Sequence, residues 1–133
     1  MARQDASREV IPRLEECSGF CLVAPIYFYH MPAIFKALVD RLQPFWSLRE
    51  TGMYPRAAQP RTCRVILIGA RPTGEQLFKG TLLTLKYALG PMGFELAEPL
   101  LLYGVDKVGD LASNAQAVRR IQEYAQEARR ERG

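Results

Sequence analysis

The stretch PIYFYHMPAIFKALVDR, residues 25–41, decides the fold of this chain. It follows directly on the apolar run from Phe20 to Ala24, and continuous apolarity is typical of a strand that is covered on both faces in a parallel sheet. Pro32 suits the first position of a helix, because the amide hydrogen that proline lacks has no helical partner there. The sequence therefore predicts a strand, a short aromatic loop and a helix over residues 32–42.

Two further apolar segments predict the other strands of the same sheet. Residues 65–68 read Val-Ile-Leu-Ile, and a third strand is expected over residues 94–103. Pro99 cannot donate to a strand ladder, so this last strand belongs at an edge. Helical segments are expected around the strands, beginning at Asp5 or Ser7 and ending at Cys17, then over 73–89 and over 111–130. This alternation indicates an α/β fold with an open parallel sheet of three strands in sequence order, flanked by helices.

Two local signals make the expected boundaries more specific. The sequence Thr73-Gly74-Glu75-Gln76 fits a capping box, which predicts a helix that starts there. Residues 43–62 form a long connection, and connections of this length are usually functional or disordered. Its aromatic side chains favour a lid or a subunit contact, and they include Phe45, Trp46 and Tyr54.

Composition indicates one partial domain over residues 1–133, with a core drawn from a hydrophobic content of 48%. The net charge of +4 gathers near the C-terminus and fits a solvated helix face, so no nucleic-acid partner is expected. No apolar run approaches a membrane span and no signal-peptide core is present, so we expect no membrane partner. The three cysteines show no metal-type pairing, and a reducing cytoplasm fits them.

The loops that follow the first two strands are the candidate binding site. Residues 25–31 and 69–74 both lie at the carboxyl ends of parallel strands, where open α/β sheets bind their ligands. Aromatic rings and free backbone amides at this edge suit a planar heterocycle. The alternative is structural: Tyr27, Phe28 and Tyr29 can also be core or interface aromatics, and His30 can simply cap the turn.

The order Pro-x-Tyr, then Pro, then Lys-x-x-x-Asp-Arg within residues 25–41 resembles the flavin loop of the NAD(P)H-dependent FMN reductases. That family has a flavodoxin-like fold. The resemblance implies that Lys36, Asp40 and Arg41 support the loop and the subunit packing. It implies no catalytic side chain, because the flavin carries the chemistry. No metal is expected either, because the cysteines show no metal-type pairing. The cofactor-binding residues that it implies are Pro25, Ile26, Tyr27, Phe28, Tyr29, His30, Met31, Ala70, Arg71, Pro72, Thr73 and Gly74.

The chain departs from the family pattern at its start. Members begin with a β-α-β unit whose glycine-rich loop holds the FMN phosphate, and only a few residues precede the first expected helix here. FMN is therefore expected to bind weakly or not at all to the isolated chain, with NAD(P)H as a possible co-substrate. The edge of the strand at residues 20–24 would also lack a neighbour, so we expect a homodimer or a separate chain that supplies the missing half.

Two functions from different classes remain open at this point. The first is a flavin-dependent NAD(P)H oxidoreductase of the FMN reductase type, with an incomplete cofactor site in this chain. The second is a non-catalytic, truncated paralogue that acts as an oligomeric binding or interaction module. A receiver-like regulatory domain fits less well, because Ala24-Pro25 and Gly69-Ala70 provide no acidic cluster at the strand ends.

Overall fold

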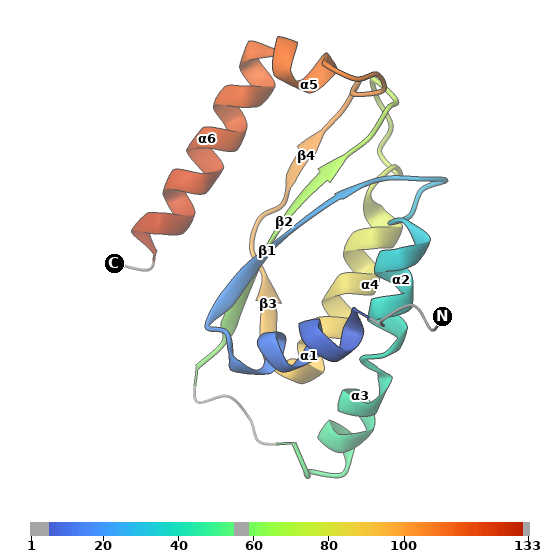
Figure 1. The fold of residues 1–133 in the computed structure, drawn as a ribbon, viewed down its shortest axis with the longest axis vertical. Coiled ribbons are helices and arrows are strands. Elements are labelled where there is room, and N and C mark those ends of the chain that lie inside the picture. Colours follow the sequence, from blue (N-terminus) through green and yellow to red (C-terminus); the bar gives the residue numbers. More distant parts are fainter. Residues whose placement is uncertain (1–5, 55–58, 132–133) are drawn as a thin grey trace.

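The computed structural model describes residues 6–54 and 59–131, so the alternative helix start at Asp5 lies outside the described residues. Helices and strands alternate along the chain, and Figure 1 shows their arrangement. The elements are α1 (Ser7–Glu16), β1 (Gly19–Pro25), α2 (Ala33–Asp40), α3 (Gln43–Glu50), β2 (Arg61–Ile68), α4 (Lys79–Leu89), the 3₁₀ helix η1 (Gly90–Met92), β3 (Phe94–Leu96), β4 (Leu100–Leu102), α5 (Asp110–Ser113) and α6 (Ala115–Arg130).

The sheet is parallel throughout its named strands, and the predicted order is confirmed. β1 pairs with β2, and β2 pairs with both β3 and β4 on its other side. The expected count of three strands was wrong, because the third apolar run forms two short strands instead of one. Pro99, in the segment between β3 and β4, has no amide hydrogen to donate to the strand ladder. The Tyr124 hydroxyl of α6 contacts this segment and donates to the Glu98 carbonyl at 2.8 Å.

β2 is the central strand and is buried on both faces. Cys63, Val65 and Leu67 belong to the main core, which packs beneath α1, α2 and α4. Ile66 points to the opposite face and joins a smaller cluster with Leu100, Leu102 and Ala117 of α6. In Figure 1, α6 accordingly lies on one side of the sheet and α1 to α4 lie on the other.

β1 lies at the edge of the sheet and is covered on one face only. Phe20 and Leu22 pack against the main core, and the Phe20 ring meets the Phe94 ring edge-on at 4.9 Å. Cys21 and Val23 point to the opposite face, and both are exposed. α6 packs against β4 and leaves this face of β1 open. The expectation of a strand covered on both faces therefore does not hold for the described residues.

Three predicted helix boundaries also need correction. The connection over 43–62 contains a helix, α3, and Pro44 fits its first turn. α4 starts at Lys79 and not at Thr73, because Leu77 and Phe78 turn inward and are buried. Burying two such side chains is worth about 1.5–3 kcal/mol each, which exceeds the roughly 1 kcal/mol of a helix cap. The last helix is broken at Asn114, whose Oδ1 accepts the Ala117 amide at 3.1 Å and caps α6.

Candidate functional site

The loops that follow β1, β2 and β4 converge at the carboxyl edge of the sheet. The Ile26 amide donates to the Ile68 carbonyl at 2.8 Å, so β1 and β2 stay paired up to the point where their loops begin. Backbone hydrogen bonds also join the loop after β2 to the loop after β4. The Gly104 amide donates to the Arg71 carbonyl at 2.9 Å, and the Val105 amide donates to the Gly69 carbonyl at 3.0 Å.

A tight turn presents the aromatic side chains of the first loop. The Tyr27 amide donates to the His30 carbonyl at 2.7 Å, and the His30 amide donates back to the Tyr27 carbonyl at 3.1 Å. The two residues between them have positive φ angles, 49° at Phe28 and 64° at Tyr29. This is the geometry of a type I′ turn, which normally selects asparagine and glycine. Two aromatic residues in left-handed conformation store strain, and strain of this kind clusters at functional sites.

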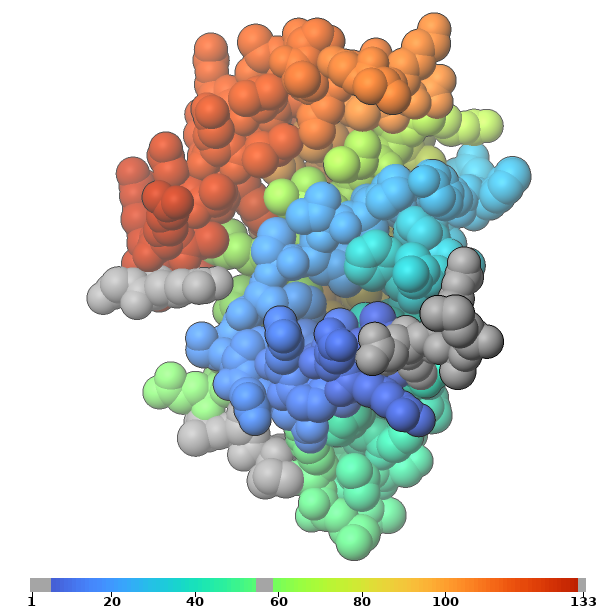
Figure 2. Space-filling model, in the orientation of Figure 1, coloured from blue at the N-terminus to red at the C-terminus, as the bar shows by residue number. Residues whose placement is uncertain are grey.

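The turn projects from the body of the molecule (Figures 1 and 2). Phe28 is fully exposed, at 101% of its reference area, and Tyr27 and Tyr29 are 61% and 45% exposed. Met31 is instead buried in the main core, so it anchors the loop and is not at the surface. Pro25, Ile26 and His30 are half-buried. The predicted cofactor residues thus divide into an exposed aromatic tip and a buried base.

α4 supports the turn from one side. His30 Nε2 lies 3.1 Å from the Thr84 hydroxyl, which is a hydrogen-bond distance. Gly80 allows the backbone of the turn to approach closely, because a β-carbon at this position would lie 3.3 Å from the Tyr29 carbonyl oxygen. The tip of the loop is therefore held by contacts at its base, while its rings remain exposed to solvent.

The second loop places free donors and one cation beside the turn. Residues 70–74 are all exposed. The Arg71 guanidinium carbon lies 5.6 Å from the centre of the Tyr29 ring, within the range of a cation–π contact. Among the described residues, no backbone carbonyl accepts from the amides of Ala70, Arg71, Thr73 or Gly74. The two loops predicted to form the site are thus brought together.

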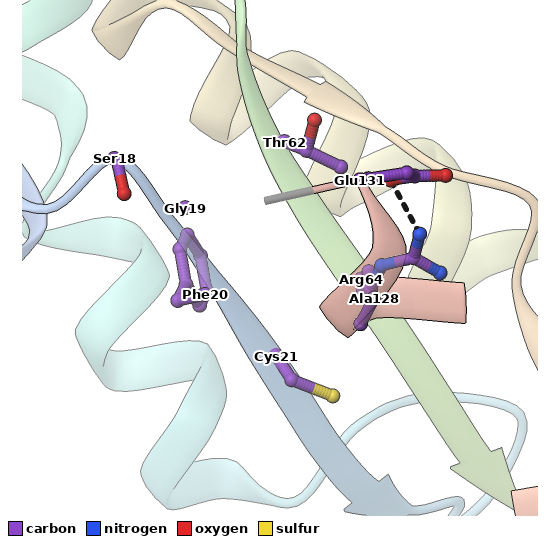
Figure 3. Close-up of a pocket in the computed structure, with 8 residues that line it drawn as sticks. All are labelled: Ser18, Gly19, Phe20, Cys21, Thr62, Arg64, Ala128 and Glu131. Atoms are coloured by element: carbon purple, nitrogen blue, oxygen red, sulfur yellow. Dashed lines mark ion pairs between the residues drawn. The ribbon is translucent and has the colours of Figure 1, made fainter. Parts of the chain in front are cut away.

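The described residues also line cavities elsewhere on the chain, and three of these have no wall from the two loops. One, of about 490 Å³, lies between β1, β2 and the end of α6 (Figure 3). Arg64 is buried beside it, forms a 2.5 Å ion pair with Glu131, and stands over the Tyr124 ring at 5.1 Å. The hydrogen bond that Arg64 donates to the Glu131 carboxylate raises the pKa of Arg64 above its ordinary value. Sequence reasoning missed this cluster, although a charge inside an apolar strand was a signal for it.

A second cavity, of about 370 Å³, is apolar and runs along the other face of β1. Its walls include Leu14 of α1, Leu22 of β1 and Leu38 of α2. The third, of about 410 Å³, lies between α2, α3 and α4, where Trp46 and Tyr87 line it. The first two cavities therefore border the free strand β1 from opposite sides.

The residues expected to support the loop make contacts within α2 and between α2 and α1. Lys36 and Asp40 form an ion pair at 2.5 Å across one turn of α2. Arg41 donates to the Ser7 hydroxyl at 3.1 Å and so ties α2 to α1. Of the aromatics expected at a subunit contact, Phe45 is buried and meets the Tyr54 ring at 5.3 Å, whereas Trp46 is exposed.

The described residues contain no group of three or more His, Cys, Asp or Glu side chains that could hold a metal ion. None of the helices in the described part of the chain is long and apolar enough to cross a membrane.

Comparison with known proteins places the chain in a family. Residues 1–126 match the family model described as a flavodoxin-like fold, which covers nearly the whole chain. The chain therefore belongs to this flavodoxin-like family, and the family predicted from residues 25–41 is confirmed. A search of curated proteins gave no match.

Solved structures agree with this assignment. A flavone reductase superimposes with a TM-score of 0.62 at 11% identity, over 90% of this chain and 44% of that protein. The Trp repressor binding protein from Bacillus subtilis gives 0.61 at 18% identity, over 88% and 70%. An NADH:FMN oxidoreductase gives 0.52 at 16% identity, over 90% and 56%. Identities this low show the fold alone. The chain spans less than half of the flavone reductase and about half of the oxidoreductase.

Proposed function

We propose that this chain provides the flavin-ring half of an FMN-dependent NAD(P)H oxidoreductase. The observation that carries the proposal is the strained turn at Phe28 and Tyr29, fixed at the carboxyl edge of the sheet with its rings exposed. A turn that met only structural needs would place asparagine or glycine there. The oxidoreductase activity named for one structural neighbour is consistent with this proposal.

The residues present fit a flavin ring. The turn offers flat aromatic surfaces for stacking, a contact worth about 1–3 kcal/mol on the scale of base–aromatic stacking. The amides of Phe28 and Tyr29 have no backbone acceptor among the described residues, so they are available to a carbonyl or a ring nitrogen of the ligand. The exposed amides of Ala70, Arg71, Thr73 and Gly74 add donors on the adjacent loop. When bound, FMN would accept a hydride from NAD(P)H and pass electrons to an acceptor.

The phosphate of FMN has no comparable anchor among the described residues. We propose that a second segment or chain completes the site along the free edge of β1. The two cavities that border this strand, one apolar and one lined by Arg64, support the proposal because they leave unfilled space beside β1.

A second candidate function is a non-catalytic interaction module. The observation that favours it is the free edge of β1, which carries no charged side chain between Gly19 and Pro25. Unprotected strand edges pair readily with other chains. A homodimer formed through this edge is the simplest version of the module. The three free thiols, Cys17, Cys21 and Cys63, support a reducing cytoplasm as its location.

Flavin binding distinguishes the two functions. The purified chain is titrated with riboflavin, and quenching of the flavin fluorescence is measured. The oxidoreductase proposal expects saturable binding with a dissociation constant near 1 mM, equal to about 4 kcal/mol, and little FMN in the protein as purified. It also expects a weaker titration for Phe28→Ala. Absence of binding at millimolar riboflavin favours the interaction module and contradicts the oxidoreductase.

A further inference from the structure

Arg71 is fixed in place beside the aromatic turn at both its backbone and its side chain. Its carbonyl accepts the Gly104 amide at 2.9 Å, which holds the loop after β2 against the loop after β4. Its guanidinium carbon lies 5.6 Å from the centre of the Tyr29 ring. The Tyr29 backbone lies close to α4, because a β-carbon added at Gly80 would lie 3.3 Å from the Tyr29 carbonyl oxygen. The cation therefore has a defined position at the turn.

No described residue forms an ion pair that would balance the charge of Arg71. It is the one lysine or arginine within residues 25–31 and 69–74, and these segments contain no aspartate or glutamate. In the described part of the chain, no carboxylate forms an ion pair with it. The side chain is exposed, so a ligand can reach it. An arginine that served only to hold the turn would not need to keep its charge free.

We infer that Arg71 stabilises negative charge on a planar redox ring bound at the Tyr27–Tyr29 turn, and so favours the reduced ring over the oxidised one. The inference rests on the proposed function, and it adds the residue that acts on the ring and the redox form that this residue favours. A hydride carries two electrons and one proton from NAD(P)H, which becomes NAD(P)⁺, to a neutral oxidised flavin ring, which becomes an anion. The new charge lies on the ring itself, which is the part of the ligand that the turn would hold.

Geometry limits how Arg71 can act. Its guanidinium is planar, it keeps its charge at all accessible pH values, and it presents several donors in one plane. Lying against the Tyr29 ring, it can offer these donors to the edge of a heterocycle beside the turn. Exposed ion pairs gain less than about 1 kcal/mol, whereas hydrogen bonds to charged groups gain about 1.5–3 kcal/mol. An effect of about 0.7–1.4 kcal/mol, near the boundary of these ranges, corresponds to a preference of about threefold to tenfold for the anionic ring.

The test compares the dissociation constants of oxidised and reduced riboflavin for the whole chain. Binding is followed anaerobically at mildly alkaline pH through the amide chemical shifts of isotope-labelled protein. The wild type is expected to bind the reduced form about threefold to tenfold more tightly. A tenfold ratio equals about 30 mV in the midpoint potential of a two-electron couple. At acidic pH, where the reduced ring is neutral, the ratio is expected to approach one.

Three variants assign this preference to Arg71. Arg71→Gln is expected to bring the ratio to about one and to change the constant for oxidised riboflavin by less than about twofold. Arg71→Lys is expected to keep part of the ratio, because the charge remains while the planar contact with Tyr29 is lost. Arg129→Gln removes the same charge from the exposed end of α6 and is expected to leave the ratio unchanged.

Each contrary outcome has its own meaning. A wild type that binds both redox forms equally overturns the role of Arg71 and leaves the proposed function standing. A loss of affinity for both forms in Arg71→Gln also overturns it, because Arg71 would then only support Tyr29. A wild type that binds neither form at millimolar concentration contradicts the proposed function itself, and this inference with it.

Discussion

Replacing Phe28 with glycine should make the protein more stable, although an aromatic side chain is removed. Phe28 is 101% exposed, so no buried area is lost. Its φ of 49° lies in the left-handed region, which costs a non-glycine residue about 1–2 kcal/mol. Glycine removes this strain but loses about 0.5–1 kcal/mol more conformational entropy on folding. The expected net gain is about 0.5–1 kcal/mol, or roughly 3 °C in melting temperature for a chain of this size.

Urea denaturation followed by circular dichroism measures this change, with Phe28→Ala as the matched control. Alanine keeps the strain and also buries nothing, so its free energy of unfolding should lie within about 0.5 kcal/mol of the wild type. Both variants should bind riboflavin more weakly than the wild type. A stability gain with a loss of binding is the signature of strain retained for function. A Phe28→Gly protein less stable than the wild type would refute the reasoning, since Phe28 would then have to pack against something.

Three further predictions concern the scaffold. Arg61 donates to the carbonyls of Leu14, Glu15 and Cys17 at 2.7–3.0 Å. Arg61→Gln should therefore lower the free energy of unfolding by about 3 kcal/mol, measured by urea denaturation. A decrease smaller than about 1 kcal/mol would contradict this. Burial raises the pKa of Cys63 from its ordinary 9.0 to about 12, so the folded thiol stays protonated where the unfolded one ionises. The free energy of unfolding should therefore fall between these pH values by up to about 1.4 kcal/mol per pH unit. Cys63→Ala should lack this part of the pH dependence. The same slope of unfolding free energy against pH in both proteins would contradict the prediction. Sedimentation equilibrium at micromolar concentration should show a species larger than 15.0 kDa, because the edge and one face of β1 are bare; a stable monomer would argue against a partner at β1.

The order and direction of the strands could be predicted because they depend on local patterns. The apolar runs and the helix-length segments between them determine a parallel sheet, and the aromatic loop after β1 lies where the rule for open sheets places it. The start of α4 could not be predicted in this way. The capping signal at Thr73 is local, whereas the burial of Leu77 and Phe78 depends on the tertiary fold. Tertiary packing overrode the local preference there.

The site shows the same difference between features that depend on local sequence and features that depend on tertiary packing. The sequence indicates which loops meet, but not that Phe28 and Tyr29 adopt left-handed angles, since aromatic residues rarely do so. The contact between Arg71 and Tyr29 also depends on how two loops pack across the sheet edge. The family resemblance included Met31 among the cofactor-binding residues, but it could not show that the Met31 side chain packs into the main core beneath the turn.

The central claim is that the aromatic turn and its neighbouring loop bind a flavin ring. The most direct measurement is an amide chemical-shift map of the labelled chain during titration with oxidised riboflavin. The account predicts progressive, saturable shifts for residues 26–31 and 69–71, with Thr73 and Gly74, and little change along α6. Shifts confined to the cavities that border β1, or no shifts at millimolar riboflavin, would contradict it.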